Sequence, residues 1–380
     1  MKRREITPRP DWRPTVEQQG LLYHTNPDGA PYWDESACYE LSLDEIERLE
    51  RAANELHGML LEACRIAIER RMLADLGIPE TMHEPIRKSW RYDDWDIHGR
   101  FDFTLAADGT PKLLEYNADT PSGLLETSIV QWYWKEQCRP EADQLNSVHE
   151  SLIARWKLLL RKGQVWSQHT LYLSSSPNHA EDRIGVSYMG ETAEQAGLTT
   201  RYLDMSEIGW NLDLERFVDL DDQPIEQLCK LYPWDWMAYE DFAFHLRGAS
   251  WHIFEPPWKM LCSSKGLLLL LQELYPGHPN LLRVSRDPNA FTSFARKPFF
   301  GREGHNISLV IDGRGTESSD GPYDEEPILY QEYCPLISTG TNFAQLGVWM
   351  VGDEACGLGI REDTHPILRG GSRFVPHIIV

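Results

Sequence analysis

The 380-residue chain lacks any hydrophobic run long enough to cross a membrane. Its most apolar stretch, 266–271, is far shorter than the roughly 20 residues that a transmembrane helix needs. Basic residues are also scarce, since 37 Lys and Arg stand against 59 Asp and Glu, which gives a net charge of −22. Nucleic acids and anionic membranes are bound through basic surfaces, so we expect neither as a partner. The acidity fits either a cationic substrate or solubility alone.

Paired cysteines are missing as well. The seven cysteines are scattered at positions 38, 64, 138, 229, 262, 334 and 356, and none has CxxC spacing. An odd number without such spacing argues against both a disulfide framework and a zinc site. The basic first residues are not followed by an apolar segment, so we expect no signal peptide. Together these features predict a cytoplasmic protein with reduced thiols.

Several well-known site motifs are absent too. The sequence contains neither G-x-x-x-x-G-K-[ST] nor G-x-G-x-x-G, so it predicts neither a Walker A loop nor a dinucleotide-binding turn. Histidines do not cluster, which argues against a zinc-dependent hydrolase. No histidine-based activation of Cys356 is visible, so we expect this thiol to be inert.

Local patterns predict alternating helices and strands behind an irregular N-terminal arm at 1–40. A helix begins cleanly after Ser42, because Ser42 and Glu45 form a capping box that satisfies two free backbone N–H groups. Apolar residues at helical spacing carry this helix into 68–76, and Gly77 ends it. Further helices are expected at 124–162 with a break near 139–140, at 191–196 and at 259–274, and strands at 168–174, 199–203, 217–224, 295–297, 307–312, 328–333 and 343–356.

The most informative segment, 98–118, predicts a β-hairpin. Asp108-Gly109 is a strong signal for a two-residue type I′ turn, which needs positive φ at both central residues. Because side chains alternate along a strand, this turn places four polar side chains on one face in two opposed pairs: Asp102 with Glu115, and Arg100 with Asn117. The apolar side chains of the hairpin take the other face, where they can pack on a core: Phe101, Phe103, Leu114 and Tyr116.

The polar face of this hairpin suits a hard cation. Two carboxylates and an amide supply three oxygen ligands, and Mg²⁺ prefers oxygen and commonly bridges to phosphate. Arg100 beside them can stabilise a phosphoryl group during its transfer. The alternative is an exposed polar face on which Arg100 relieves the repulsion between Asp102 and Glu115.

Two lysines and a glycine loop form a second cluster in the C-terminal third. Lys265 follows two serines, and Lys297 ends a predicted strand. Gly301 and Gly304 follow in the next few residues and can bring backbone N–H groups close to phosphates. An ordinary turn is the alternative for this loop.

These segments resemble the synthetase domain of the glutathionylspermidine synthase family. The similarity rests on Arg-x-Asp-x at 100–103, Glu-Tyr-Asn-Ala-Asp at 115–119 and Lys-Pro-x-x-Gly-Arg-Glu-Gly-x-Asn at 297–306. It covers nearly all of the chain after residue 20. Further matching segments lie at 193–197, 230–236, 330–333, 352–363 and 373–377.

The resemblance implies roles for individual residues. In the family, the first Asp, the Glu and the Asn of these motifs bind magnesium, which assigns Asp102, Glu115 and Asn117 to the metal. The Arg contacts the phosphate under transfer, which makes Arg100 the catalytic residue. The implied ATP-binding residues are Arg100, Phe101, Asp102, Lys265, Lys297, Gly304, Gln331 and Arg361. Residues 330–333 would form a hinge strand around the adenine.

The implied fold is a mixed α+β and α/β structure of the ATP-grasp type. It has a nucleotide-binding cleft between subdomains and a small Rossmann-like αβ subdomain. Because single cores stop growing near about 250–300 residues, we expect three parts. They are 1–165 with the arm, helices and metal-binding hairpin, 166–250 as the small αβ substrate subdomain, and 251–380 as the ATP-grasp nucleotide-binding part.

The implied activity is that of an ATP- and Mg²⁺-dependent acid–amine ligase that forms an amide through an acyl phosphate. Its partners are a small-molecule acid and an amine, with a peptide and a polyamine-like cation as candidates. Acidic residues near Glu181-Asp182 or near Trp234-Asp235 could hold the amine, or they are ordinary solvated acids. Residues 120–123, Thr-Pro-Ser-Gly, depart from the Ser-Ala-Ser-Cys of glutathione-using members, which leaves the acid open. The alternative function is an ATP-binding or ATPase module that acts through a protein partner.

Overall fold

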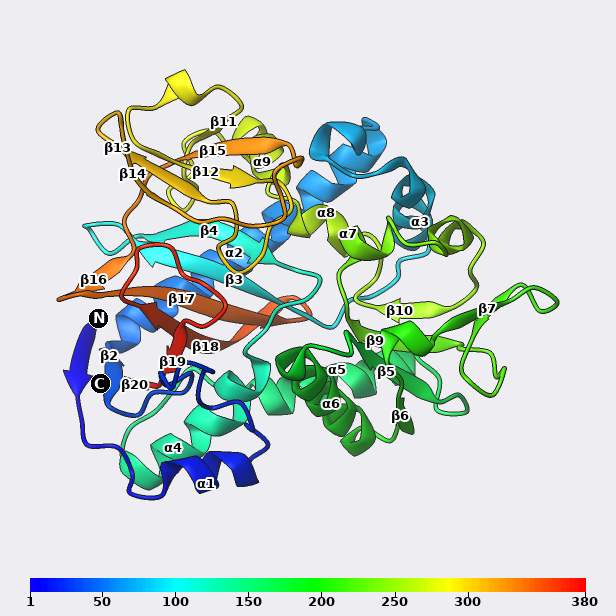
Figure 1. Cartoon of the computed structure of the whole chain (residues 1–380), viewed down its shortest axis with the longest axis horizontal. Helices are drawn as coiled ribbons and strands as arrows, with labels where there is room; N and C mark the ends of the chain where they lie inside the picture. Colours follow the sequence, from blue (N-terminus) through cyan, green and yellow to red (C-terminus); the bar gives the residue numbers. More distant parts are fainter.

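The computed structural model describes residues 1–380 and centres on a six-stranded antiparallel sheet (Figure 1). Five strands follow the order β19-β18-β17-β3-β4, and β16 pairs with β17. The predicted hairpin of β3 and β4 thus joins strands from the C-terminal third of the chain. The bounds of these strands are β3 (His98–Leu105), β4 (Pro111–Asn117), β16 (Ile337–Thr339), β17 (Asn342–Val351), β18 (Glu354–Asp363) and β19 (Arg373–Val375).

Helices cover both faces of this central sheet. The long helix α2 (Leu43–Glu69) packs on one face, and its predicted capping box between Ser42 and Glu45 is present. The larger apolar core lies on that side and includes Phe101 and Phe103. On the opposite face lie α5 (Val148–Lys162) and the π-helical segment η2 (Glu126–Val130).

A five-stranded antiparallel sheet, drawn in yellow and orange, lies beside β4 (Figure 1). Its order is β11-β15-β12-β13-β14. The predicted helix at 259–274 is divided into two helices by a short break at 264–266, and α9 packs against both α2 and β11. The bounds are α8 (Lys259–Ser263), α9 (Leu267–Leu274), β11 (Val284–Ser285), β12 (Phe294–Pro298), β13 (Ser308–Ile311), β14 (Arg314–Ser318) and β15 (Ile328–Glu332).

A small parallel sheet, drawn in green, forms the other side of the molecule (Figure 1). Its four strands follow the order β10-β9-β5-β6 and all pair in parallel. Helix α6 (Ala180–Gln195) packs on β5 and β9, and α5 packs on α6. This part confirms the predicted Rossmann-like unit. The bounds are β5 (Leu171–Ser175), β6 (Thr200–Tyr202), β9 (Gln227–Leu231) and β10 (His252–Phe254), with a separate hairpin of β7 (Gly209–Asn211) and β8 (Arg216–Val218).

The prediction of an irregular N-terminal arm is wrong. Residues 1–41 contain β1 (Lys2–Glu5), the short helix α1 (Trp12–Gln18) and β2 (Ala37–Leu41). Strand β2 pairs with β1 and, in parallel, with the C-terminal strand β20 (His377–Ile379), so the two ends of the chain lie together (Figure 1). The arm carries buried side chains such as Trp33 and Tyr39, and their burial rather than any local pattern fixes its course.

The predicted turn of the β3–β4 hairpin is also wrong, whereas the predicted pairing at its far end is right. A three-residue loop at 107–109 replaces the two-residue turn, and only Gly109 has positive φ there. Next to the loop, the register of the two strands therefore differs by one residue from the predicted one. A bulge at Leu114 restores the predicted register, so that Asp102 faces Glu115 and Arg100 faces Asn117. The bulge also turns Leu114 away from the core, and Leu113 takes its place opposite Phe103.

The remaining helices connect these sheets. They are η1 (Ala74–Leu76), α3 (Glu80–Arg91), α4 (Gln131–Cys138), η3 (Met205–Glu207), α7 (Trp234–Met237), η4 (Ala243–Arg247) and η5 (Pro288–Ala290). The predicted mixed α/β class is confirmed, and the division of the chain at 165 and 250 stays a prediction. None of the helices combines the length and the apolar character that crossing a bilayer requires.

Candidate functional site

A cavity of about 330 Å³ opens where the central sheet, the five-stranded sheet and the green αβ unit meet. Nine of the predicted site residues line it. They are Arg100, Asp102, Glu115, Asn117, Lys265, Lys297, Gly304, Gln331 and Arg361. Residues separated by more than 260 positions are therefore brought to one cavity.

Phe101 is the one predicted site residue whose side chain lies elsewhere. Its ring is fully buried in the core on the α2 side of the sheet and stacks on Tyr116, with 4.0 Å between ring centroids. Strand alternation causes this, because Arg100 and Asp102 point into the cavity. Any contact of Phe101 with a ligand would have to come from its main chain.

Asp102 is buried beneath a network of hydrogen bonds. Arg100 approaches it with two donors, Nε at 2.7 Å from Oδ1 and Nη2 at 3.0 Å from Oδ2. Asn117 Nδ2 donates to Oδ2 at 2.8 Å. Burial raises the pKa of Asp102, and the Arg100 guanidinium opposes that shift. Arg100 also donates to the carbonyl of Ser122, which fixes the guanidinium above the sheet.

Close packing below the guanidinium adds to this positioning. Gly347 on β17 lies beneath Arg100, and a Cβ at this glycine would come within 2.8 Å of Arg100 Cδ. Only a glycine leaves enough space there for the arginine to lie flat across the sheet.

Glu115 is paired with Lys265 from the other side of the cavity, and the charge of Lys297 acts on it without direct contact. Lys265 Nζ lies 2.9 Å from Glu115 Oε2 and donates to the carbonyl of Gly301 at 3.0 Å. Burial disfavours the charged carboxylate, but Lys265 and then Lys297 lower the pKa of Glu115 to about 2. Glu115 is therefore ionised throughout the neutral range.

Lys297 is buried without a carboxylate in direct contact. Its Nζ donates to Gln331 Oε1 at 2.7 Å and to the carbonyl of Leu114 at 3.3 Å, which the bulge turns toward the cavity. Gln331 in turn donates to the carbonyls of Leu113 and Leu114. Burial lowers the pKa of Lys297 to about 8.

Arg361 and the glycine loop close the remaining side. Arg361 on β18 donates through Nη2 to the carbonyls of Arg369 and Gly370, while its buried Nε has no partner. Gly304 has φ of +71°, and a Cβ there would lie 2.1 Å from the carbonyl oxygen of Leu368. The loop therefore requires glycine at this position to lie against the 367–370 segment.

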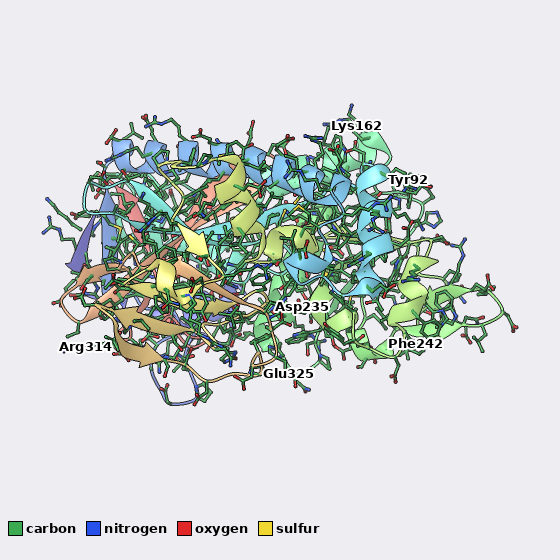
Figure 2. All side chains as sticks on the ribbon, turned by 90° about the horizontal axis from the view of Figure 1, so that it is seen from above. Tyr92, Lys162, Asp235, Phe242, Arg314 and Glu325 are labelled. Carbon is green, nitrogen blue, oxygen red and sulfur yellow. The ribbon has the colours of Figure 1, made fainter.

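Sequence reasoning missed one arginine at the cavity although its motif was visible. Arg302, inside the glycine loop, donates to both carboxylate oxygens of Asp235, at 2.9 and 2.6 Å. Figure 2 shows Asp235 near the middle of the molecule, where the five-stranded sheet meets the αβ unit. The pair ties the loop to that unit. Arg302 lies between Gly301 and Gly304 of the loop that was expected to approach phosphates, and this position was the signal available in the sequence.

The donor set fits a hard cation such as Mg²⁺. Asp102 and Glu115 sit on one face with the amide of Asn117, so two carboxylates and one amide offer oxygen ligands. A cation here would complete its shell with oxygens of a ligand or water, as Mg²⁺ commonly does. Four cationic side chains around two carboxylates also leave positive charge for an anionic ligand: Arg100, Lys265, Lys297 and Arg361.

Comparison with known proteins gives this cavity a context. Residues 3–380 match the family described as glutathionylspermidine synthase preATP-grasp. The chain belongs to this family. The membership confirms the resemblance that the motifs at 100–103, 115–119 and 297–306 carried.

Similar curated proteins agree with that assignment. A protein of Haemophilus influenzae, provisionally named an acid–amine ligase, is 37% identical over 98% of this chain and 98% of its own length. Trypanothione synthetase of Crithidia fasciculata is 30% identical over 81% of this chain, and the bifunctional glutathionylspermidine synthetase/amidase of Escherichia coli is 26% identical over 90%. The matched regions make up 51% and 59% of those two longer proteins.

The fold has a solved counterpart as well. A glutathione synthetase-like effector from Globodera pallida, in its apo form, superposes with a TM-score of 0.57 at 9% identity, covering 99% of this chain and 100% of that one. The fold is thus of the predicted ATP-grasp type. Within its family, the protein is an ATP-dependent ligase of the acid–amine class, as predicted, and the ATPase-module alternative is not favoured.

The low pKa of Lys297 predicts how ATP binding depends on pH. The ammonium is charged below about pH 8 and neutral above it, and only the charged form attracts phosphate. ATP affinity, measured by calorimetry, should therefore fall several-fold as the pH rises from about 7 to about 9. The variant Lys297→Arg keeps its charge in this range and should lose most of that dependence. An affinity in the native protein that stays constant across the range would exclude a phosphate contact by Lys297.

Proposed function

We propose that this protein joins an acid to an amine by activating the acid as an acyl phosphate, with ATP and Mg²⁺ bound in the cavity described above. One observation carries the proposal. Asp102 and Glu115 lie side by side on a rigid sheet face, within one cavity that also contains Arg100, Lys265 and Lys297. Such a set of paired carboxylates and cations suits a metal–triphosphate complex.

The adenine and the triphosphate of ATP have distinct places in this proposal. Residues 331–334 at the end of β15 line the cavity. Ala295 pairs with Gln331 and with Leu309, and both apolar residues, Ala295 and Leu309, also line the cavity, which suits a flat apolar base. Lys265, Lys297 and Arg361 hold the phosphates. When bound to Asp102, Glu115 and Asn117, Mg²⁺ would supply positive charge to the phosphate oxygens. Arg100 lies beside these ligands and stabilises the charge that develops on the phosphoryl group in transit.

The acid and the amine take the side of the cavity opposite the adenine. The acid carboxylate lies near Arg100 and Ser122, so that one of its oxygens can reach the γ-phosphate. For the amine we favour Glu181 and Asp182 over Asp235, because Asp235 is already paired with Arg302. Asp182 lines the cavity, and burial together with the charge of Glu181 raises its pKa to about 7.

The candidate substrates follow from the names of the relatives. Glutathionylspermidine and trypanothione synthetases suggest a peptide such as glutathione as the acid and a polyamine such as spermidine as the amine. The amine fits the acidic side of the cavity, whereas the 120–123 segment leaves other acids open. We place the reaction in the cytoplasm, because all seven cysteines are free.

Release of ADP tests the ligase directly. The protein is incubated with ATP, Mg²⁺ and a panel of carboxylic acids and peptides, with and without amines. We expect turnover that requires both an acid and an amine, and a product whose mass equals their sum less one water. Slow turnover that is indifferent to every acid and amine would instead support an ATPase module.

The metal proposal predicts the effect of two conservative substitutions. Asp102→Asn and Glu115→Gln remove a negative charge without a change of shape, so each should abolish Mg²⁺-dependent ATP turnover while the protein stays folded. Asp108→Asn, on the exposed loop of the same hairpin, is the matched control and should turn over ATP normally. Normal turnover in folded Asp102→Asn and Glu115→Gln proteins would remove the metal from this site.

Arg100 should matter more for the rate than for ATP binding. Its charge acts on the phosphoryl group in transit, and loss of one such donor typically lowers kcat about 100- to 1000-fold. Arg100→Ala should therefore lower kcat and kcat/KM together while KM for ATP changes little. Arg314→Ala, an exposed arginine labelled in Figure 2, is the control. A normal kcat with a lower melting temperature would make Arg100 a purely structural partner of Asp102.

A further inference from the structure

A buried acidic cluster lies beside the cavity, and one of its members, Glu126, has no part in the steps above. Glu126, on η2, is only 1% exposed. Its Oε1 accepts hydrogen bonds from the hydroxyls of Tyr23 at 2.8 Å and Tyr32 at 2.9 Å, while its buried Oε2 has no partner. The hydroxyl of Tyr32 is also 2.9 Å from Oε1 of Glu181, at the start of α6. Three distant segments thus bring two carboxyl groups to one hydroxyl.

If both carboxyl groups were ionised, only one of their two contacts with the Tyr32 hydroxyl could be a hydrogen bond. The Tyr32 hydroxyl has a single hydrogen and can donate to only one of the two carboxyl groups. Both contacts are hydrogen bonds if one carboxyl group is protonated, since it then donates to the Tyr32 oxygen while Tyr32 donates to the other. Two ionised carboxylates would instead repel each other across a buried hydroxyl.

Glu126 is the better holder of that proton. Burial, followed by the charge of Glu181, raises the pKa of Glu126 to about 7. Burial also raises the pKa values of Tyr23 and Tyr32 well above the usual range, so both hydroxyls stay neutral. The other charged groups that act on the cluster are Asp182 and Arg361, and Glu181 in turn acts on Arg100.

The cluster is connected to the cavity through α6. Asp182 follows Glu181 directly and lines the cavity, as do Arg361 and Ser122. A cation that binds at Asp182 and Glu181 would offset the repulsion between Glu181 and an ionised Glu126. Protonation of Glu126 would then no longer be favoured, because the negative charge of Glu181 that raises the pKa of Glu126 is neutralised by the cation.

We propose that Glu126 and Glu181 share one proton through Tyr32 in the free protein, and that this proton passes to solvent when an ammonium group of the amine substrate binds at Glu181 and Asp182. This rests on the amine position given under the proposed function. One positive charge enters as the ammonium and one leaves as the proton, so the net charge of the site is unchanged. Glu126 acts here as a positioning residue that adjusts the charge of the amine site without touching the substrate.

Infrared difference spectra of the full chain test the shared proton without any substrate. At slightly acidic pH, the native protein compared with Glu126→Gln should show the carbonyl band of a protonated carboxyl group. The same comparison with Glu191→Gln, an exposed carboxylate on α6, the helix that carries Glu181, should show no such band. Tyr32→Phe should shift the band by removing the bridge, which provides a second variant if Glu126→Gln does not fold. Absence of the band in the native protein would overturn the proposal.

Addition of amines tests the release. Titration with spermidine should remove the band, and calorimetry in two buffers of different ionisation enthalpy should report up to one proton released per spermidine bound. The part of the release that comes from Glu126 should be lost in Glu126→Gln and kept in Glu191→Gln. A band that persists through titration with monoamines, diamines and polyamines would overturn the proposal. Loss of the band on amine binding without ligation of any acid would contradict the proposed function alone.

Discussion

An ionised carboxylate needs nearby positive charge when it is buried, and the region around β3 and β4 is organised by that requirement. Asp102 is paired with Arg100, and Glu115 with Lys265. The opposite face of the same hairpin is apolar and lies in the main core, so strand alternation separates the charged face from the packed one. The charged groups are therefore fixed by the core rather than by flexible loops.

A second buried ion pair joins the parallel αβ unit to the hairpin of β3 and β4. Lys230 on β9 lies 2.8 Å from Asp119, two residues beyond the end of β4, and both are almost fully buried. Asp119 also accepts a hydrogen bond from the backbone N–H of Trp234 at 2.7 Å. Loss of either partner would leave an uncompensated charge inside the protein, which typically costs about 3–5 kcal/mol. The αβ unit is thus held firmly against the hairpin that carries the proposed metal ligands.

The sequence was sufficient for the parts of the site that lie on one hairpin and insufficient for those assembled from distant segments. The opposition of Asp102 and Glu115 was predicted correctly even though the turn was not, because the bulge at Leu114 offsets the longer loop. Periodicity identified α2 and the parallel αβ unit. It could not foresee that Tyr32 from the N-terminal arm reaches Glu126 and Glu181, since no local pattern encodes a contact between segments 94 and 149 residues apart. The course of the arm itself follows from burial against the finished core.

Transfer of oxygen from the acid to phosphate tests the central claim most directly. If the acid attacks the γ-phosphate and the amine then displaces phosphate, one carboxylate oxygen must leave with the phosphate. An acid labelled with ¹⁸O in its carboxylate is therefore converted with ATP and the amine, and the inorganic phosphate is analysed by mass spectrometry. The account predicts one labelled oxygen in each phosphate formed. Amide formation that yields phosphate without the label would contradict an acyl-phosphate route through this cavity.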